Sequence, residues 1–186
     1  MKTIATIALK LAGWKIIGGI PADVKKCVIL AAPHTSNWDF VIGRLAYWYL
    51  DVPVKFLIKK EAFAHPLGFL VKRMGGIPVD RKKNTNLVEQ VAELFNHYDV
   101  LNVIITPEGT RKLVKEWKKG FYYIALRAQI PIALGFVDYK NKIGGFGPTF
   151  YPSGNFEEDF KMIENFYRNK SAKNPALFNL SPENTK

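Results

Sequence analysis

A histidine and an aspartate five residues apart are the side chains of this sequence best suited to acid–base chemistry. His34 and Asp39 lie in the segment 32–40, where a buried strand is expected to end and a helix to begin. An imidazole can take a proton from a hydroxyl near neutral pH. A carboxylate on the other ring nitrogen would hold the required tautomer and stabilise the imidazolium. The spacing therefore predicts a general base with an orienting partner.

The same segment also allows a purely structural interpretation. Ser36 could cap the helix with Asp39 at the third helical position, which resembles a capping box with Asp in place of Glu or Gln. On that interpretation, Asp39 only completes a helix end and His34 is a turn residue. The pattern His-x4-Asp by itself does not decide between the two.

Two further segments combine glycine with charge where a strand ends. In segment 105–111, Arg111 could bind a phosphate or carboxylate through two hydrogen bonds, and Gly109 lets the backbone approach a ligand. The alternative is a polar turn with a local pair between Glu108 and Arg111. Segment 75–83 joins two glycines to a basic exit, which suits an anion site or an ordinary solvated turn.

Taken together, these segments resemble the four ordered motifs of the glycerophospholipid acyltransferase superfamily, whose best-known members are the lysophosphatidic acid acyltransferases. The matching segments are His34-x4-Asp39, 76–81, 107–111 and 130–132. His34 precedes Glu108 by 74 residues, similar to the family spacing, and the resemblance runs from about residue 28 to residue 137.

The resemblance implies an O-acyltransferase. His34 would be the general base and Asp39 its partner, and an acceptor hydroxyl would attack the thioester of an acyl-CoA or acyl carrier protein directly. The acceptor would be a lyso-lipid such as 1-acyl-glycerol-3-phosphate, with no metal and no cofactor. Residues at positions associated with binding of the acceptor and its phosphate are Arg81, Glu108, Gly109, Thr110 and Arg111. Pro131 matches the fourth motif, which lines the acyl or acceptor pocket.

Two departures from the family pattern leave the acceptor headgroup open. Pro78 stands where the second motif usually has an aromatic residue, and Thr35 replaces a longer polar residue after the histidine. Short bacterial members that acylate other lyso-lipids, including aminolipids, are similar in outline, so such an acceptor is an alternative.

The elements that must position these residues alternate along the chain. Strands are expected at 28–32, 54–58, 77–79, 101–105 and 132–137, and helices at 39–50, 62–74, 87–98, 121–127 and 157–168. The segment 144–154, rich in Gly and Pro, reads as a loop with at most an edge strand. This alternation predicts a single α/β domain over residues 21–186, with a largely parallel sheet flanked by helices.

A short amphipathic helix is expected within residues 1–20. Ile4, Ile7, Leu11 and Trp14 recur at helical spacing over residues 4–17, and Lys2, Lys10 and Lys15 add positive charge. This helix could pack on the core or bind in the plane of a membrane surface. The second interpretation predicts a peripheral protein at the cytoplasmic face of a membrane.

The charge of the chain points to phosphate-bearing partners. The net charge of +11 is concentrated in residues 55–83, which contribute 8 − 2 = +6, and 111–119, which contribute 5 − 1 = +4. Anionic lipid, the phosphates of coenzyme A or an acidic carrier protein would be attracted to such a surface. A non-catalytic nucleic-acid-binding domain explains the charge equally well, but leaves His34 and Asp39 without a role, so no nucleic acid is expected.

Other functional classes find less support. A single cysteine, Cys27, excludes a disulfide scaffold and sits in an apolar run that is expected to be core. His65 and His97 have no partners at metal-ligand spacing. The longest uncharged stretch, 143–156, has 14 residues with four Gly and two Pro, too short for a membrane span of roughly 20 residues.

Overall fold

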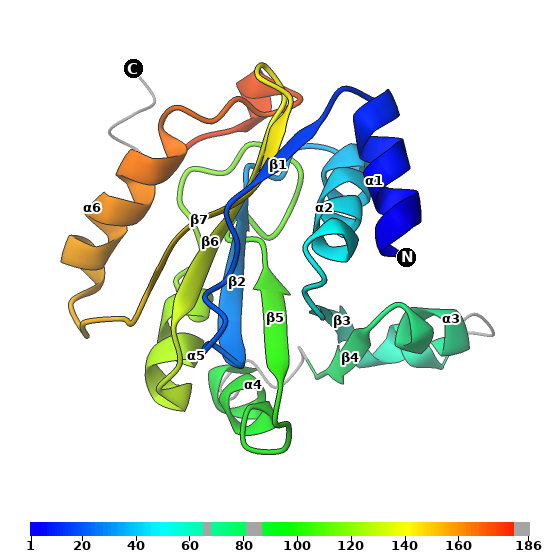
Figure 1. The fold of residues 1–186 in the computed structure, drawn as a ribbon. Coiled ribbons are helices and arrows are strands. Elements are labelled where there is room, and N and C mark those ends of the chain that lie inside the picture. Colours follow the sequence, from blue (N-terminus) through cyan, green and yellow to red (C-terminus); the bar gives the residue numbers. More distant parts are fainter. Residues whose placement is uncertain (65–67, 81–86, 181–186) are drawn as a thin grey trace.

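The computed structural model describes residues 1–64, 68–80 and 87–180, which form an α/β domain around one sheet (Figure 1). Within these residues the sheet has seven strands in the order β1-β7-β6-β2-β5-β3-β4. Neighbouring strands are parallel except for β6 and β7. The strands are β1 (Lys15–Ile17), β2 (Lys26–Ala32), β3 (Lys55–Lys59), β4 (Gly76–Val79), β5 (Leu101–Ile105), β6 (Ile132–Asp138) and β7 (Ile143–Phe150). The predicted α/β class with a largely parallel sheet is confirmed.

Helices cover both faces of the sheet. They are α1 (Lys2–Leu11), α2 (Asn37–Tyr49), α3 (Gly68–Arg73), α4 (Leu87–Leu94), α5 (Gly120–Ala128) and α6 (Phe156–Tyr167), with the short 3-10 helices η1 (Lys60–Phe63) and η2 (Pro175–Leu177). Figure 1 shows α1 and α2 side by side, with α6 on the opposite side of the sheet.

The central strand β2 explains why the chain needs two helical layers. Val28 and Leu30 share a core cluster with buried residues of α4, α5 and α6, whereas Cys27 and Ile29 share a second cluster with Tyr47 of α2. All four strand residues are fully buried. Because successive side chains of a strand point to opposite faces, a continuous apolar run requires cover on both sides. This burial fixes β2, and with it the loop that carries His34.

The N-terminal helix is shorter than expected. It ends at Leu11 rather than near residue 17, because the chain turns at Gly13, whose φ of +74° is left-handed. Residues 15–17 then form β1, which pairs with β7 and joins the sheet.

The sequence left open whether the stripe of Ile4, Ile7 and Leu11 packs on the core or faces outward. Ala5 and Leu9 are buried, and α1 packs against α2. Ile4, Ile7 and Leu11 are exposed, Leu11 to 84%. The helix therefore packs on the domain with one face and presents its large apolar side chains on another.

The prediction of a loop with at most an edge strand at 144–154 holds for residues 151–154 but is wrong for 144–150. This segment contributes most of β7, an inner strand between β1 and β6. Glycine is required for this arrangement at Gly145, whose φ is +135° and where a Cβ would collide with the carbonyl oxygen of Ile17. The glycines thus allow close approach of β1 rather than marking a turn.

The helix predicted at 62–74 is two shorter elements, η1 and α3. The expected bend near Pro66 lies outside the described residues, and so do His65 and Arg81. The remaining predicted strands and helices are present, with ends that differ by a few residues.

Candidate active site

The candidate site lies at the carboxyl edge of the sheet, where the central strands end. His34 follows β2, the segment 106–111 follows β5, and Tyr139 follows β6. Because β2 is parallel to both β5 and β6, the loops after these strands meet at one edge. Open α/β sheets bind ligands at this edge.

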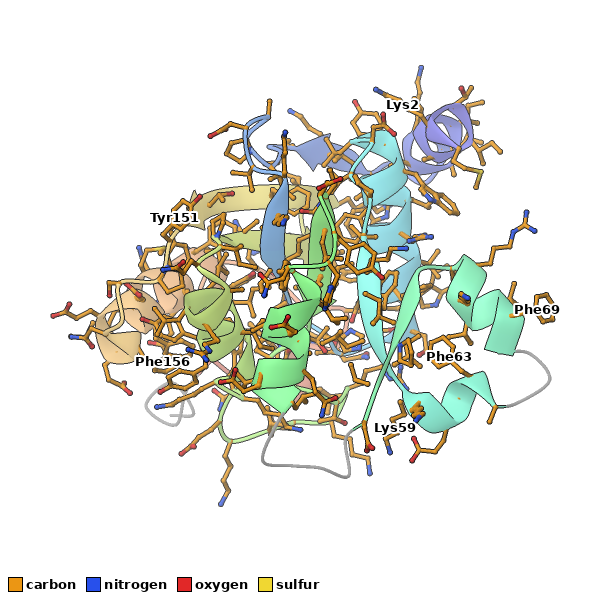
Figure 2. All side chains as sticks on the ribbon, turned by 90° about the horizontal axis from the view of Figure 1, so that it is seen from below. Lys2, Lys59, Phe63, Phe69, Tyr151 and Phe156 are labelled. Atoms are coloured by element: carbon orange, nitrogen blue, oxygen red, sulfur yellow. The ribbon has the colours of Figure 1, made fainter. Side chains whose placement is uncertain are left out.

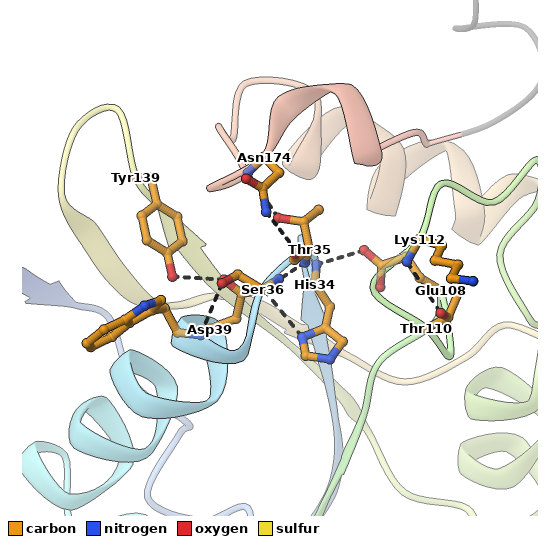
Figure 3. A network of polar contacts seen from close by, with 10 residues as sticks. His34, Thr35, Ser36, Asp39, Glu108, Thr110, Lys112, Tyr139 and Asn174 are labelled. Carbon is orange, nitrogen blue, oxygen red and sulfur yellow. Dashed lines mark hydrogen bonds and ion pairs between the residues drawn. The ribbon is translucent and has the colours of Figure 1, made fainter.

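His34 and Asp39 lie together as the sequence predicts (Figure 3). The Nδ1 atom of His34 is 3.4 Å from Oδ2 of Asp39, and the two side chains are 20% and 6% exposed. With Nδ1 facing the carboxylate, Nε2 is the ring nitrogen left to accept a proton from a substrate.

Asp39 is also a helix cap, so the two interpretations of the segment coexist. Its Oδ2 accepts the backbone N–H of Thr35 at 2.7 Å and of Ser36 at 2.8 Å, and Ser36 Oγ accepts the N–H of Trp38 at 3.2 Å. These contacts complete the capping box. Burial alone would raise the pKa of Asp39. Hydrogen bonds from His34, Ser36, Tyr139 and Thr35 outweigh burial and place the pKa below its ordinary value.

Glu108 turns inward and supports the histidine rather than forming the expected local pair with Arg111. Its Oε1 accepts the backbone N–H of His34 at 2.9 Å, and its other oxygen is buried without a partner among the described residues. Burial raises the pKa of Glu108 to about 7. The carboxylate is therefore an anchor for the His34 backbone.

The β2–α2 loop has a third support from the C-terminal part of the chain. The backbone N–H of Asn174 donates to Thr35 Oγ1 at 3.2 Å, and its side-chain amide donates to the Thr35 carbonyl at 2.9 Å. Thr35 is buried by these contacts. Nothing in the sequence near either residue indicates this pairing, because 139 positions separate them.

Two cavities meet at His34 and differ in character. The first, of about 210 Å³, runs between α2 and the sheet and is lined mainly by apolar residues, among them Phe40, Ala46, Tyr47, Ile104 and Phe136. The second, of about 390 Å³, is lined by Thr106, Gly109, Thr110, Arg111 and Lys112. His34 lines both cavities.

Of the predicted acceptor-binding residues, Gly109, Thr110 and Arg111 therefore lie around the polar cavity. Gly109 has φ +65°, which suits glycine, and its N–H donates to the Thr106 carbonyl at 3.1 Å. Lys112, which the sequence reasoning did not single out, adds a second cation. Its only sequence signal was membership of the basic stretch 111–119.

Pro131 does not meet its expectation. It immediately precedes β6, and its carbonyl accepts the N–H of Val28 near the start of β2. That position is at the amino end of the strands, away from His34, and Pro131 lines neither cavity. Pro78 lines a different hollow beside α3 and β4.

Other side chains that could carry chemistry have structural surroundings. Burial raises the pKa of the Cys27 thiol to about 12, and its Sγ donates to Asn102 at 3.2 Å. His97 is exposed beside Glu93, with 3.7 Å between Nε2 and Oε1. Among the described residues, no group of three or more His, Cys, Asp or Glu side chains is placed to hold a metal ion.

A histidine between an apolar and a cationic cavity suits an enzyme that joins an apolar group to a polar acceptor. The family model for acyltransferases matches residues 17–133, more than half of the chain. The chain therefore belongs to the acyltransferase family, which confirms the resemblance seen in the sequence and favours catalysis over nucleic-acid binding.

The structure is also similar to the crystal structure of the 1-acyl-sn-glycerophosphate (LPA) acyltransferase PlsC from Thermotoga maritima. The TM-score is 0.59 with 16% sequence identity, over 92% of this chain and 80% of that chain. At this identity the similarity establishes the shared fold. No curated protein matches the sequence. In the part of the chain that the structure describes, no helix is long and apolar enough to cross a bilayer.

Proposed function

We propose that this acyltransferase transfers a fatty acyl group from an acyl thioester to a hydroxyl of a lyso-lipid such as 1-acyl-glycerol-3-phosphate. The observation that carries the proposal is the position of His34, which lines both the apolar and the cationic cavity. The apolar lining of the first cavity suits an acyl chain and the cations of the second suit an acceptor phosphate, which would bring the reacting groups together at the imidazole.

His34 acts as the general base in this proposal. Its Nε2 takes the proton of the acceptor hydroxyl while the oxygen attacks the thioester carbonyl. The resulting tetrahedral intermediate collapses, the C–S bond breaks, and the imidazolium returns the proton to the leaving thiolate. The products are an ester and a free thiol. Asp39 faces Nδ1 throughout and stabilises the imidazolium.

The cationic cavity favours a phosphate-bearing acceptor. Arg111 and Lys112 are exposed at its rim, and the guanidinium can donate two parallel hydrogen bonds to one phosphate. The structural relative named above is described as an acyltransferase for a glycerophosphate. An uncharged or zwitterionic aminolipid acceptor would leave these cations without a matching anion.

We also propose peripheral attachment to an anionic membrane at its cytoplasmic face, a proposal that exposed apolar side chains support. Ile4, Ile7 and Leu11 of α1 are exposed, and Lys2 and Lys10 flank them. Further exposed apolar residues are found on the first turns of α2 (Trp38, Phe40, Val41) and on and directly after α3 (Phe69, Leu70, Met74). Figures 1 and 2 both place α1 and α3 on the side away from α6. Apolar side chains next to lysines suit the boundary of an anionic bilayer.

The acyl-transfer proposal is tested with purified protein, oleoyl-CoA or oleoyl-acyl carrier protein, and 1-oleoyl-glycerol-3-phosphate in mixed micelles. The expected result is a free thiol and phosphatidic acid in equal amounts. The same donors with a lyso-aminolipid should give a much lower kcat/KM. Absence of thiol release with either donor and either acceptor would overturn the proposal, and a preference for the aminolipid would reassign the acceptor.

The membrane proposal is tested by co-sedimentation with anionic vesicles at low salt. The variant Ile4→Ser/Ile7→Ser/Leu11→Ser should bind at least about tenfold more weakly while keeping its melting temperature, since these side chains are not in the core. The control Val100→Ser/Leu126→Ser/Leu177→Ser removes exposed apolar surface elsewhere and should bind normally. Equal binding by both variants, or binding that does not weaken with salt, contradicts the proposal.

A further inference from the structure

We propose that Tyr139 is a positioning residue for the His34–Asp39 pair. Its hydroxyl fixes the orientation of the Asp39 carboxylate, although Tyr139 lies outside all the sequence motifs. The inference rests on the proposed function, because it assumes that this pair performs the proton transfer. Tyr139 lies in the turn between β6 and β7, and its OH donates to Oδ1 of Asp39 at 2.8 Å (Figure 3).

The two oxygens of Asp39 have different partners. Oδ2 receives the N–H groups of Thr35 and Ser36 and faces Nδ1 of His34. Oδ1 receives the hydroxyl of Tyr139. The terminal torsion of an aspartate is soft, so contacts to one oxygen alone leave the carboxylate plane free to rock. A donor on the second oxygen fixes that plane, and with it the direction in which Oδ2 meets the imidazole.

The surroundings of Tyr139 hold its hydroxyl in place. Its ring meets the ring of Trp14 edge-on, with 5.2 Å between centroids and an interplanar angle of 89°. Its backbone N–H donates to the Ser171 carbonyl at 2.9 Å. The carboxylate of Asp138 accepts the N–H of Lys140 at 3.1 Å and the side-chain amide of Asn141 at 2.8 Å, which closes the turn. The Tyr139 hydroxyl is therefore held in a fixed position.

Chemistry limits Tyr139 to the role of a donor. Burial, followed by the hydrogen bond to Asp39, raises the pKa of Tyr139 above its ordinary value. The hydroxyl thus stays protonated over the working pH range and acts on His34 only through Asp39. Tyr139 lines neither cavity, so it is not placed to touch the acyl chain or the acceptor.

The decisive variant is Tyr139→Phe, which removes one hydroxyl and keeps the ring against Trp14. We expect kcat to fall about tenfold, with the KM values of donor and acceptor unchanged within a factor of two. The matched control is Tyr122→Phe. Tyr122 also donates to an aspartate, Asp159, at 2.8 Å, but through α5 and α6 rather than at the site. This control should lose at least as much stability and keep its kcat.

A double-mutant cycle distinguishes positioning from a general structural effect. In an Asp39→Asn background, adding Tyr139→Phe should lower kcat by less than twofold, because the hydroxyl acts through the carboxylate. Three outcomes would each overturn the inference. They are a kcat of Tyr139→Phe within twofold of the unmodified protein, a change confined to KM, and a tenfold further loss of kcat in the Asp39→Asn background.

A spectroscopic readout separates failure of this inference from failure of the proposed function. The chain has three histidines, so the ¹⁵N ring signals of His34 can be assigned by comparison with His34→Ala. Tyr139→Phe should shift the Nδ1 signal of His34, and Tyr122→Phe should not. If the protein transfers no acyl group but the shift is present, the positioning stands and the reaction is wrong. If the signal does not move, the positioning is wrong.

Discussion

Two loops at the same edge of the sheet are built in opposite ways. Where the loop after β2 enters α2, Thr35 of the loop and Asp39 of the helix are both buried. Their polar atoms bond to each other, to Tyr139 of the β6–β7 turn and to Asn174 of the C-terminal segment. In the loop after β5, residues 109–113 are exposed, and two of them are cations.

The difference between these loops matches the demands of the two tasks. Proton transfer needs the base at hydrogen-bond distance from the hydroxyl, about 3 Å, with little room for displacement. The loop that carries His34 is accordingly fixed from several sides. Binding of a phosphate tolerates adjustment, because flexible cations can follow the anion. Glu108 joins the two loops, since it is buried directly before the exposed segment and accepts the N–H of His34.

Removal of the base should have the largest effect. His34→Ala should lower kcat by about two to four orders of magnitude, because no other group described at the site is placed to take the hydroxyl proton. The fold should survive, since the cavity-facing imidazole is not part of the apolar core. Thiol release measures the rate and circular dichroism the fold. A loss of less than tenfold would mean that the fixed loop does not carry the base.

Asp39→Asn should have the next largest effect and lower kcat by roughly one to three orders of magnitude. Asparagine keeps an oxygen that can accept the cap hydrogen bonds but loses the negative charge that stabilises the imidazolium. The melting temperature and kcat are measured on the same preparation. A stable variant with near-normal kcat would mean that Asp39 is a helix cap only, and that the rigid loop after β2 does not serve to orient the base.

Arg111→Lys should act on binding rather than on turnover. Lysine keeps the charge but cannot donate two parallel hydrogen bonds, so we expect the acceptor KM to rise about three- to tenfold with little change in kcat. Arg127→Lys is the control, because Arg127 is an exposed arginine on α5 that pairs with Glu89. If only the donor KM rises, the exposed loop binds coenzyme A rather than the acceptor.

Glu108→Gln should have the smallest effect, and this effect should be on the stability of the fold rather than on kcat. The pKa of Glu108 is raised from 4.5 to about 7 in the fold, so the native state binds more protons than the unfolded state between these values. Stability contributed by this group is therefore present below about pH 4.5 and lost as the pH rises through 7.

The buried glutamine has no such titration. From pH 5 to pH 8 the unmodified protein should lose stability as Glu108 ionises, so its melting temperature should fall relative to that of Glu108→Gln. The change should be on the order of 2 kcal/mol, or a few degrees. Glu157→Gln, an exposed partner of Lys119, is the control and should show no such trend. A pH-independent difference would mean that Glu108 titrates normally.

The sequence by itself determined those features that depend on neighbouring residues. The capping box and the His34–Asp39 pair both fall within the six residues 34–39, and the loop from Gly109 to Arg111 is equally local. The apolar runs of β2, β5 and β6 predicted a parallel sheet, because strands without a polar face must be covered on both sides. Parallel strands in turn bring the two loops to one edge.

Only the tertiary structure decided which other groups reach the site and which faces stay exposed. Glu108 could have paired locally with Arg111, but packing turns it toward His34, 74 residues away. Tyr139 meets Asp39 across 100 residues, and Asn174 meets Thr35 across 139. On α1, helical spacing predicted an apolar stripe without deciding whether it packs on the core or faces outward. In the fold, Ala5 and Leu9 form the interface with α2 while Ile4, Ile7 and Leu11 face outward. Periodicity predicts that a helix has an apolar face, but the shape of the neighbouring element decides which residues pack against it.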